Sequence, residues 1–300
     1  MKDILLIGGA GNIGHKLISL LDENYSITVL DLKSKLSEER LSKYSNQIKI
    51  VYGDVENYKL VESLVKKNDV VINLAGIMPP LANLSHKLAK SINYDGTRNI
   101  VDAINKVNKS CLLIYPSFIS IYGKTAEDKR PLKVTTKKEK LDYYSESLVQ
   151  CEEYIKKYAE KYIILRLPIV LTKDNYYVRH MKLNRVFDFI TVEDLNNVIN
   201  NLIMNKKAYN KTFNVGGFKA NSTDFIRKLY KYNGKIHMSK RGYYFGEYDD
   251  LDRLNSLIKV TYHTEKDYFK ALKRESGLIR RNYRKLFNII TFIYYKIKTK

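Results

Sequence analysis

The first half of the chain alternates between short apolar runs and longer amphipathic segments. The apolar runs DILLIGG, SITVLD, IKIVYGD, DVVINLAG, CLLIYPS and YIILRLP fall within residues 3–168. Continuous apolar runs are typical of strands buried on both faces, and the segments between them have the periodicity of helices. The expected helices are 12–24, 57–67, 85–107 and 144–161. This alternation predicts an α/β fold, a doubly wound parallel sheet with helices on both faces.

The pattern becomes irregular after residue 170. We expect a strand at 187–191, a helix at 193–205, a strand at KTFNVGG and a helix opened by NSTDFI, with Asn221, Ser222 and Thr223 as candidate caps. The sequence contains no internal repeat and no linker rich in Pro, Gly or Ser. The two halves are therefore expected to pack as one body.

Composition limits the classes of site. The 300 residues suit one large α/β unit or two modest domains, and a hydrophobic content of 44% is ample for a core. Cys111 and Cys151 are the only cysteines, which excludes a disulfide framework and a thiolate metal site. The five histidines have no ligand spacing, so no metal is expected.

The formal net charge of +21 is spread along the chain. Because no zinc-finger spacing, ribonucleoprotein-type aromatic motif or basic leucine zipper is present, nucleic acid is an unlikely partner and a minor hypothesis. The apolar run in MKDILLIGGAGNIG is too short for the core of a signal peptide and is read as the first buried strand. A cytoplasmic location is expected.

Charge is concentrated only in the last segment, 277–300. Its apolar run, 286–295, is shorter than the roughly 20 residues that a membrane-spanning helix needs. Two interpretations stay open. The segment lies in an anionic membrane interface, which would make the protein peripheral to the inner face of a membrane, or it docks on the protein as a final helix. The flanking cations are Arg280, Arg281, Arg284, Lys285, Lys296, Lys298 and Lys300.

A glycine motif follows the first expected strand. Gly8, Gly11 and Gly14 let the chain turn sharply and bring backbone N–H groups close to a pyrophosphate at a helix N-terminus. Asn12 and Ile13, inside the loop, belong to the same predicted cofactor site. The second strand ends in Asp31, followed by Leu32, where a carboxylate accepts hydrogen bonds from an adenosine ribose and repels a 2′-phosphate. The motif therefore favours NAD over NADP.

Two further strand ends carry cofactor candidates. Asp54 and Val55 follow the third strand, where an adenine would lie. Leu74, Ala75 and Gly76 end the fourth strand and would form a close wall against the cofactor. Ligands of parallel sheets bind at the carboxyl ends of strands, which favours a binding role over a simple turn.

These motifs resemble, in order and spacing, the extended short-chain dehydrogenase/reductases, the NAD-dependent epimerase/dehydratase group. The likeness covers nearly the whole chain. It is carried by GGAGNIG, Asp31, GDV, NLAG, NYDGTRNI, PSFISIYG, YYSESLVQCEE, LRLP, FDFITVEDL and KTFNVGG.

The resemblance implies a Rossmann sheet with bound NAD and, in many members, chemistry on a nucleotide-linked sugar. It implies an NAD-binding domain at 1–168, a reduced substrate-side region at 169–275 and a basic aromatic tail at 276–300. It adds Asn93, beneath the cofactor, and Pro168, the last residue of LRLP, to the cofactor site. Members often pair through two helices, which here are 85–107 and 144–161.

Family enzymes use a Ser or Thr, a tyrosine that shuttles a proton, and a lysine four residues after that tyrosine. Tyr144 takes the place of the tyrosine, and it is implied as both a catalytic and a cofactor-binding residue. The place of the lysine holds Leu148, and that of the hydroxyl residue holds Phe118, with Ser117 one position earlier as a weaker candidate. The sequence thus predicts a degenerate site.

A second departure lies between LRLP and FDFITVEDL. Only about 20 residues stand where sugar-nucleotide members usually have a long substrate-binding insertion. Arg179 and Arg185 in this segment are candidates to hold a phosphate or carboxylate of the substrate, although exposed loop charges are more often only solvated.

Two functional hypotheses follow. The first is an NAD-dependent epimerase/dehydratase-type oxidoreductase that acts on a carbohydrate or nucleotide-sugar, with Tyr144 as the remaining acid/base. The second is a non-catalytic NAD-binding sensor or assembly protein.

Overall fold

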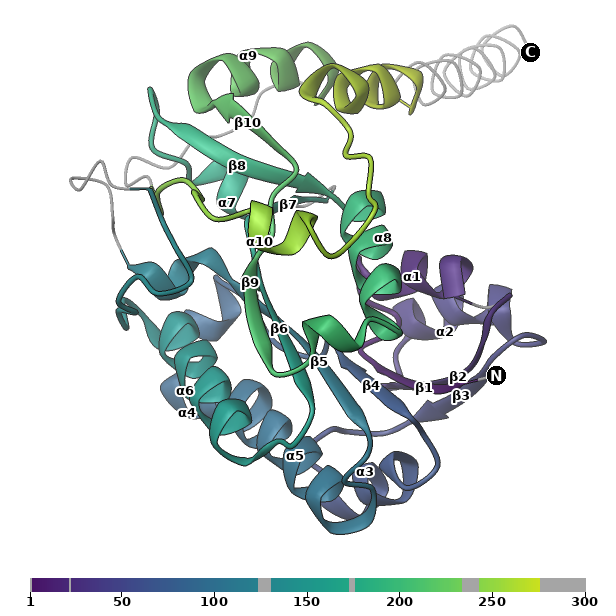
Figure 1. Ribbon diagram of the computed structural model, residues 1–300. Helices are drawn as coiled ribbons and strands as arrows, with labels where there is room; N and C mark the ends of the chain where they lie inside the picture. Colours follow the sequence, from purple (N-terminus) through teal and green to yellow (C-terminus); the bar gives the residue numbers. More distant parts are fainter. Residues whose placement is uncertain (1, 22, 124–130, 173–175, 234–242, 276–300) are drawn as a thin grey trace, which may run out of the picture.

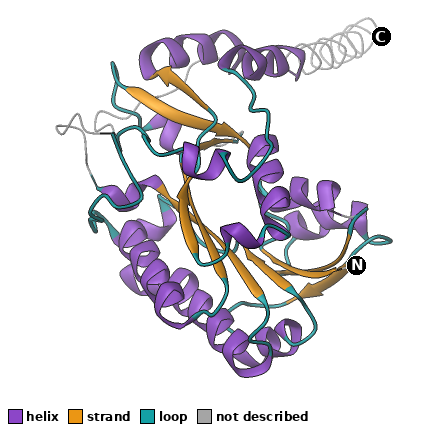
Figure 2. Ribbon diagram, in the orientation of Figure 1, coloured by secondary structure: helices purple, strands orange, loops and turns teal. Residues whose placement is uncertain are grey.

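The computed structural model describes residues 2–21, 23–123, 131–172, 176–233 and 243–275. Its main feature is a seven-stranded sheet in the order β3-β2-β1-β4-β5-β6-β9, and every neighbouring pair is parallel (Figures 1 and 2). The predicted parallel sheet is confirmed. Its strands are β1 (Lys2–Ile7), β2 (Tyr25–Asp31), β3 (Lys49–Tyr52), β4 (Val70–Asn73), β5 (Leu112–Phe118), β6 (Tyr162–Leu167) and β9 (Lys211–Asn214).

Helices cover both faces of this sheet (Figure 1). On one face α1 (Gly14–Leu21) packs against α8 (Val192–Ile203), close to α2 (Lys35–Leu41). On the other face α5 (Gly96–Val107) packs between α3 (Tyr58–Val65) and α6 (Tyr143–Tyr158). Since both faces are covered, the central strands are mostly apolar; β4, for example, is buried at every position and only its last residue, Asn73, is polar.

The expected helix at 85–107 consists of several pieces. Helix α4 (His86–Ala89) leads into the π-helical turn η3 (Lys90–Asp95) and then into α5, and the 3₁₀ turn η2 (Leu81–Asn83) precedes them. Asn93 lies in the π-helical turn and is buried. A π-helical turn inserts an extra residue into a helix and is frequent at functional sites.

A second, three-stranded sheet lies beyond the carboxyl ends of the large sheet (Figure 1). Strand β8 (Val186–Thr191) pairs in parallel with β7 (Ile169–Leu171) and antiparallel with β10 (Phe218–Asn221), which leads into α9 (Ser222–Asn233). Neither β7 nor β10 was expected from the sequence. The short helices α7 (Tyr176–Arg179) and α10 (Asp252–Asn255) and the 3₁₀ turns η1 (Ser42–Tyr44), η4 (Ile119–Tyr122) and η5 (Lys206–Ala208) complete the elements.

The chain beyond residue 168 packs back on the large sheet, which takes its last strand, β9, from that part. The boundary at 168 stays a prediction. The expected tail, 276–300, lies outside the described residues, as does the proposed membrane contact of 277–300. Within the described ranges, no helix is both long and apolar enough to cross a membrane.

Candidate functional site

A cavity of about 350 Å³ opens at the carboxyl ends of the central strands. Its wall is formed by the loop between β1 and α1, the chain after β4, the end of β5 and the start of α6. Later residues of the wall are Leu167, Ile169, Val170, Thr172, Tyr176 and Tyr177. Most predicted cofactor residues line it, namely Gly8, Gly11, Asn12, Ile13, Gly14, Leu74, Ala75, Gly76, Asn93 and Tyr144. Ser117, Phe118 and Leu148 line it as well.

The glycine loop at the start of α1 leaves no space for a side chain at Gly8 or Gly14. Gly8 has a φ of +81°, and a Cβ there would lie 2.8 Å from the backbone of Leu74 and Ala75. A Cβ at Gly14 would lie 2.6 Å from the carbonyl oxygen of Gly8. The wall at this point is therefore bare backbone at a helix N-terminus, which fits the pyrophosphate of a dinucleotide.

Asp31 is positioned by the same loop. One carboxylate oxygen accepts a hydrogen bond from the backbone N–H of Ala10 at 2.7 Å, and the other accepts one from Leu32 at 2.8 Å. Burial raises the pKa of Asp31, and these two bonds oppose that change. Since a carboxylate has about four lone-pair sites, it retains acceptor capacity for a ribose hydroxyl. The residues present thus fit an adenine dinucleotide.

The remaining cofactor candidates do not line the cavity. Asp54 accepts a hydrogen bond from the N–H of Glu56 at 2.9 Å, Val55 is buried, and Leu32 is 57% exposed. Pro168 is not part of the cavity wall, although its neighbours Leu167 and Ile169 are. The adenine contacts and the Pro168 contact stay predictions.

Asn93 connects the wall after β4 to α6. Its side-chain oxygen accepts from the N–H of Ile77 at 2.8 Å, and its amide donates to the carbonyl oxygen of Ile77 at 3.1 Å and to the hydroxyl of Ser147 at 3.0 Å. The side chain is only 4% exposed. A surface position for Asn93, the alternative to a role beneath the cofactor, is excluded.

The start of α6 fixes Tyr144. Asp142 caps the helix by accepting from the N–H of Ser145 at 2.8 Å, and Asn83 donates to Asp142 while accepting from the N–H of Tyr144. Burial raises the pKa of Tyr144, and the negative charge of Asp142 raises it further. Among the described residues no cation lowers this pKa, and Leu148 lines the cavity one helical turn later. Tyr144 is therefore a protonated phenol at neutral pH.

The two candidates for the hydroxyl position both line the cavity, but their side chains have different neighbours. The centre of the Phe118 ring lies 6.3 Å from the centre of the Tyr144 ring. The Phe118 ring also stacks on the Tyr177 ring, with the two centres 4.6 Å apart. Ser117 is buried near Glu152, and within the described residues its hydroxyl group has no hydrogen-bond partner. Successive residues of a strand face opposite sides of a sheet, which accounts for the difference.

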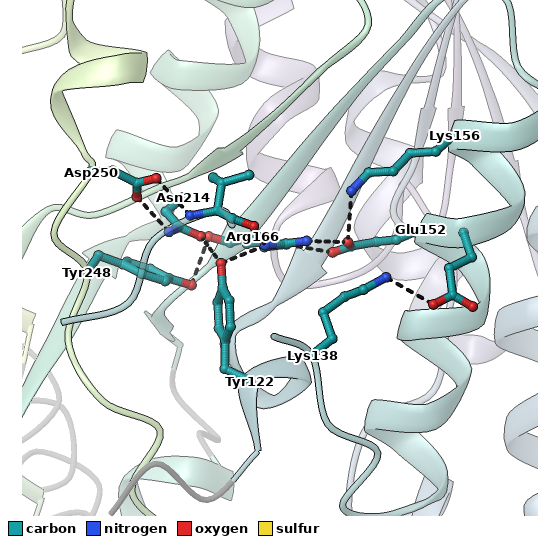
Figure 3. Close-up of polar contacts among 10 residues, drawn as sticks. Tyr122, Lys138, Glu152, Lys156, Arg166, Asn214, Tyr248 and Asp250 are labelled. Carbon is teal, nitrogen blue, oxygen red and sulfur yellow. Dashed lines mark hydrogen bonds and ion pairs between the residues drawn. The ribbon is translucent and has the colours of Figure 1, made fainter. Parts of the chain in front are cut away.

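A buried polar network extends from Glu152 across the end of β6 (Figure 3). Arg166 is 1% exposed and donates two hydrogen bonds to the Glu152 carboxylate, at 3.0 and 2.7 Å. Burial acts to raise the pKa of Glu152, but Arg166 outweighs burial and the pKa is lowered. Lys156 lies 3.6 Å from the same carboxylate. The pair of Glu152 on α6 and Arg166 on β6 attaches α6, and with it Tyr144, to the sheet.

The network continues into the C-terminal part of the chain (Figure 3). Arg166 donates to the Tyr122 hydroxyl at 2.7 Å, which donates to the side-chain oxygen of Asn214, also at 2.7 Å. Asn214 donates to Asp250 at 2.7 Å, and the Tyr248 hydroxyl donates to the carbonyl oxygen of Arg166 at 3.0 Å. The sequence suggested neither this network nor its partners, because nothing local marks contacts across tens of residues.

The two predicted substrate-binding arginines lie outside the cavity wall. Arg179 and Arg185 are both exposed. Arg185 donates to the carbonyl oxygen of Asn184 at 3.2 Å, and its guanidinium lies 6.0 Å from the centre of the Tyr244 ring. A role in substrate binding stays a prediction for both. Within the described ranges, no group of His, Cys, Asp or Glu is arranged to hold a metal ion.

Comparisons with known proteins agree with this geometry. Residues 5–167, more than half of the chain, match the model of the 3-beta hydroxysteroid dehydrogenase/isomerase family. A UDP-N-acetyl-alpha-D-glucosaminuronate decarboxylase of Bacillus cytotoxicus is 34% identical over 133 residues, 41% of this chain and 38% of that protein. The mouse 3 beta-hydroxysteroid dehydrogenase type 7 is 28% identical over 123 residues, 40% and 33% of the respective chains. The chain thus matches little more than a third of the length of these curated relatives.

Solved structures share the fold over nearly the whole chain. A UDP-glucuronic acid 4-epimerase variant of Bacillus cereus, in complex with NAD and a fluorinated UDP-glucuronic acid, has a TM-score of 0.77 at 18% identity and covers 92% of this chain and 99% of its own. A UDP-glucose-4-epimerase of Stenotrophomonas maltophila, with bound NAD, has a TM-score of 0.78 at 16% identity, with coverages of 94% and 100%. The chain belongs to the 3-beta hydroxysteroid dehydrogenase/isomerase family, within the extended short-chain dehydrogenase/reductases.

Proposed function

We propose that this protein binds NAD in the cavity. Support comes from the bare glycine loop at Gly8 and Gly14, from the acceptor Asp31 beside it, and from the wall around Asn93. The carboxylate at Asp31 favours a free ribose hydroxyl over a 2′-phosphate, and therefore NAD over NADP. The solved structures with the same fold that are described as complexes with NAD add support.

The proposed activity is an oxidation or reduction at a carbon that carries a hydroxyl or keto group in a carbohydrate or nucleotide-sugar. When bound, NAD supplies the two-electron redox chemistry. Relatives of this chain include enzymes named for UDP-, CDP- and dTDP-linked sugars. The observation that carries the proposal is the placement of the Tyr144 ring in the same cavity as the glycine loop.

In this proposal Tyr144 holds and transfers the proton of the reacting hydroxyl group. A tyrosine with an unperturbed pKa near 10 is ionised to about one part in a thousand at neutral pH. Burial and the charge of Asp142 raise the pKa of Tyr144 and reduce that fraction further. Since a positioned acid or base contributes roughly 10²–10⁴-fold, turnover by this site is expected to be slow.

The test is formation of NADH from NAD⁺ by the purified full chain, with UDP-glucose, UDP-glucuronic acid and dTDP-glucose as trial substrates. Tyr144→Phe removes only the hydroxyl group and is expected to abolish turnover. Tyr143→Phe is the matched control, since Tyr143 precedes it on α6, is 43% exposed and does not line the cavity. Equal activity of Tyr144→Phe and Tyr143→Phe would rule out Tyr144 as the acid/base.

A second candidate function is NAD binding without turnover, as a sensor or assembly subunit. It is favoured by the apolar side chains of Leu148 and Phe118 at the two places where family enzymes have lysine and hydroxyl groups. In that case the wild-type chain binds NAD but produces no NADH, and activity requires Leu148→Lys together with Phe118→Ser.

We also propose that two copies pair through α5 and α6. This pairing is supported by tyrosines on α6 and on η3, with ring centres 5.9 Å apart for Tyr94 and Tyr154 and 4.5 Å apart for Tyr154 and Tyr158. Tyr158 is 43% exposed although it belongs to this cluster. Analytical ultracentrifugation is expected to show a dimer that Tyr158→Glu weakens. Contact of 277–300 with an anionic membrane remains a prediction about residues that the structure does not describe.

A further inference from the structure

The cavity contains a second phenol that does not belong to the family's three-residue pattern. Tyr177, on α7, lines the same cavity as Tyr144 although the two residues come from distant parts of the chain. Its ring stacks on Phe118 with centres 4.6 Å apart and planes inclined by 27°. Phe118 occupies the position of the missing hydroxyl residue, so the ring of Tyr177 lies beside that position.

The ring of Tyr177 is held on several sides. Three rings contact it edge to face. Their centres lie 5.6 Å (Phe245), 6.0 Å (Tyr243) and 5.3 Å (Tyr176) from the centre of the Tyr177 ring. Tyr177 is 3% exposed and Phe245 is 1% exposed. A ring fixed in this way carries its hydroxyl group at a defined position, as a hydrogen-bond donor to a substrate requires.

The two phenols are also close enough to affect each other. Burial raises the pKa of Tyr177, and the next contribution is the charge that Tyr144 acquires when it ionises. Charges of Asp142, Tyr243 and Tyr176 act in the same direction. Both hydroxyl groups therefore remain protonated at neutral pH, and both can donate hydrogen bonds.

We propose that the Tyr177 hydroxyl group takes the place of the missing serine hydroxyl. It donates a hydrogen bond to the substrate oxygen that Tyr144 protonates or deprotonates and, when no substrate is bound, to the Tyr144 phenolate. This role rests on the proposed function. Tyr177 transfers no proton; it stabilises the negative charge that develops on the substrate oxygen. The competing explanation is that Tyr177 is only an aromatic core residue, for which the hydroxyl group is dispensable.

The first test needs no substrate. 2,3,5-Trifluorotyrosine, a more acidic analogue of tyrosine, is placed at position 144 of the full chain, and its ionisation is followed by ¹⁹F NMR with NAD⁺ present. Tyr177→Phe is expected to raise the midpoint of this ionisation, because a donor to the phenolate is lost. Tyr244→Phe is the matched control, since Tyr244 packs on Phe187 and does not line the cavity. An unchanged midpoint in Tyr177→Phe would overturn the proposal.

The second test is kinetic. With any nucleotide-sugar that the wild type oxidises, Tyr177→Phe is expected to lower kcat roughly 10²-fold, as loss of one oxyanion donor does. Adding Phe118→Ser to Tyr177→Phe is expected to restore part of that loss, because the hydroxyl group returns at the serine position. Full activity of Tyr177→Phe, at an unchanged melting temperature, would contradict the proposal. If the wild type oxidises none of the sugars, the proposed function fails, and the NMR titration still decides the role of Tyr177.

Discussion

Leu148 lies one helical turn after Tyr144 on α6, and both side chains line the cavity that begins at the glycine loop. In the family pattern a lysine at this place lowers the pKa of the tyrosine. Here Leu148 is 5% exposed and leaves the phenol in apolar surroundings. The fold keeps the tyrosine in position, but among the residues that the structure describes no cation activates it.

Leu148→Lys is therefore expected to increase turnover. A lysine near Tyr144 stabilises the phenolate, so the rise in the oxidation rate with pH should move to lower pH. The measurement is the pH profile of NADH formation between pH 6 and 10. Leu148→Met, which conserves volume, controls for packing. A profile for Leu148→Lys that coincides with that of Leu148→Met would contradict this role for the position.

The glycine loop predicts a sharp difference between two alanine substitutions. Gly8→Ala places a Cβ 2.8 Å from rigid backbone at a φ of +81° and should abolish NAD⁺ binding. Gly11→Ala meets only one atom, the carbonyl oxygen of Gly8, at 3.2 Å, and should weaken binding much less. Isothermal titration with NAD⁺ measures both affinities. The explanation would be wrong if Gly8→Ala bound NAD⁺ as tightly as Gly11→Ala.

The buried ion pair predicts a large stability difference between neighbouring glutamates. Glu152→Gln leaves Arg166 buried without its countercharge and should lower the free energy of unfolding by about 3–5 kcal/mol. Glu153→Gln is the control, since that side chain is 59% exposed and pairs with Lys138. Urea unfolding at pH 7 measures both values. Similar free energies for the two variants would show that the pair contributes little.

The same pair fixes a dependence on pH. The pKa of Glu152 is lowered in the folded protein. Its contribution to the free energy of unfolding is therefore fully present above the unfolded pKa of about 4.3 and is lost as pH falls through the folded pKa. The free-energy difference between wild type and Glu152→Gln should therefore stay constant from pH 6 to 8 and shrink below about pH 4.

Asp188 should show the opposite dependence. Burial raises its pKa to about 6, although the N–H of Tyr248 donates to it at 2.8 Å. The contribution of Asp188 to the free energy of unfolding is present below the unfolded pKa of about 3.9 and is lost as pH rises through the folded pKa. Asp188→Asn should therefore match the wild type near pH 4 and be more stable at pH 8, by about 3 kcal/mol. Thermal unfolding at both pH values tests this, with the exposed Asp249→Asn as control; a more stable wild type at pH 8 would refute it.

Much of the fold follows from local patterns in the sequence. Continuous apolar runs identified the parallel strands, and the glycine loop was placed correctly because its strand–turn–helix context is contiguous. Asn93 and Tyr144 were placed in the cavity wall by motif resemblance. Such features are visible because the residues that form them are neighbours along the chain.

The remaining features depend on contacts between distant segments. Tyr177 reaches Phe118, and Arg166 reaches Tyr122 and Glu152, only after the chain has folded. No periodicity marks such partners. Arg179 and Arg185 were chosen for their charge, yet both are exposed, whereas the neighbouring tyrosines of α7 line the cavity. In this segment burial of rings, rather than charge, determines which side chains face the cavity.

The central claim is that the cavity binds a nicotinamide dinucleotide. Native mass spectrometry of the purified full chain, followed by titration with NAD⁺, tests it most directly. We expect one NAD per chain in the wild type, weaker binding of NADP⁺, and none in Gly8→Ala. Absence of any NAD⁺ binding by the folded wild type at concentrations up to about 1 mM, a binding free energy weaker than about −4 kcal/mol, would contradict the account.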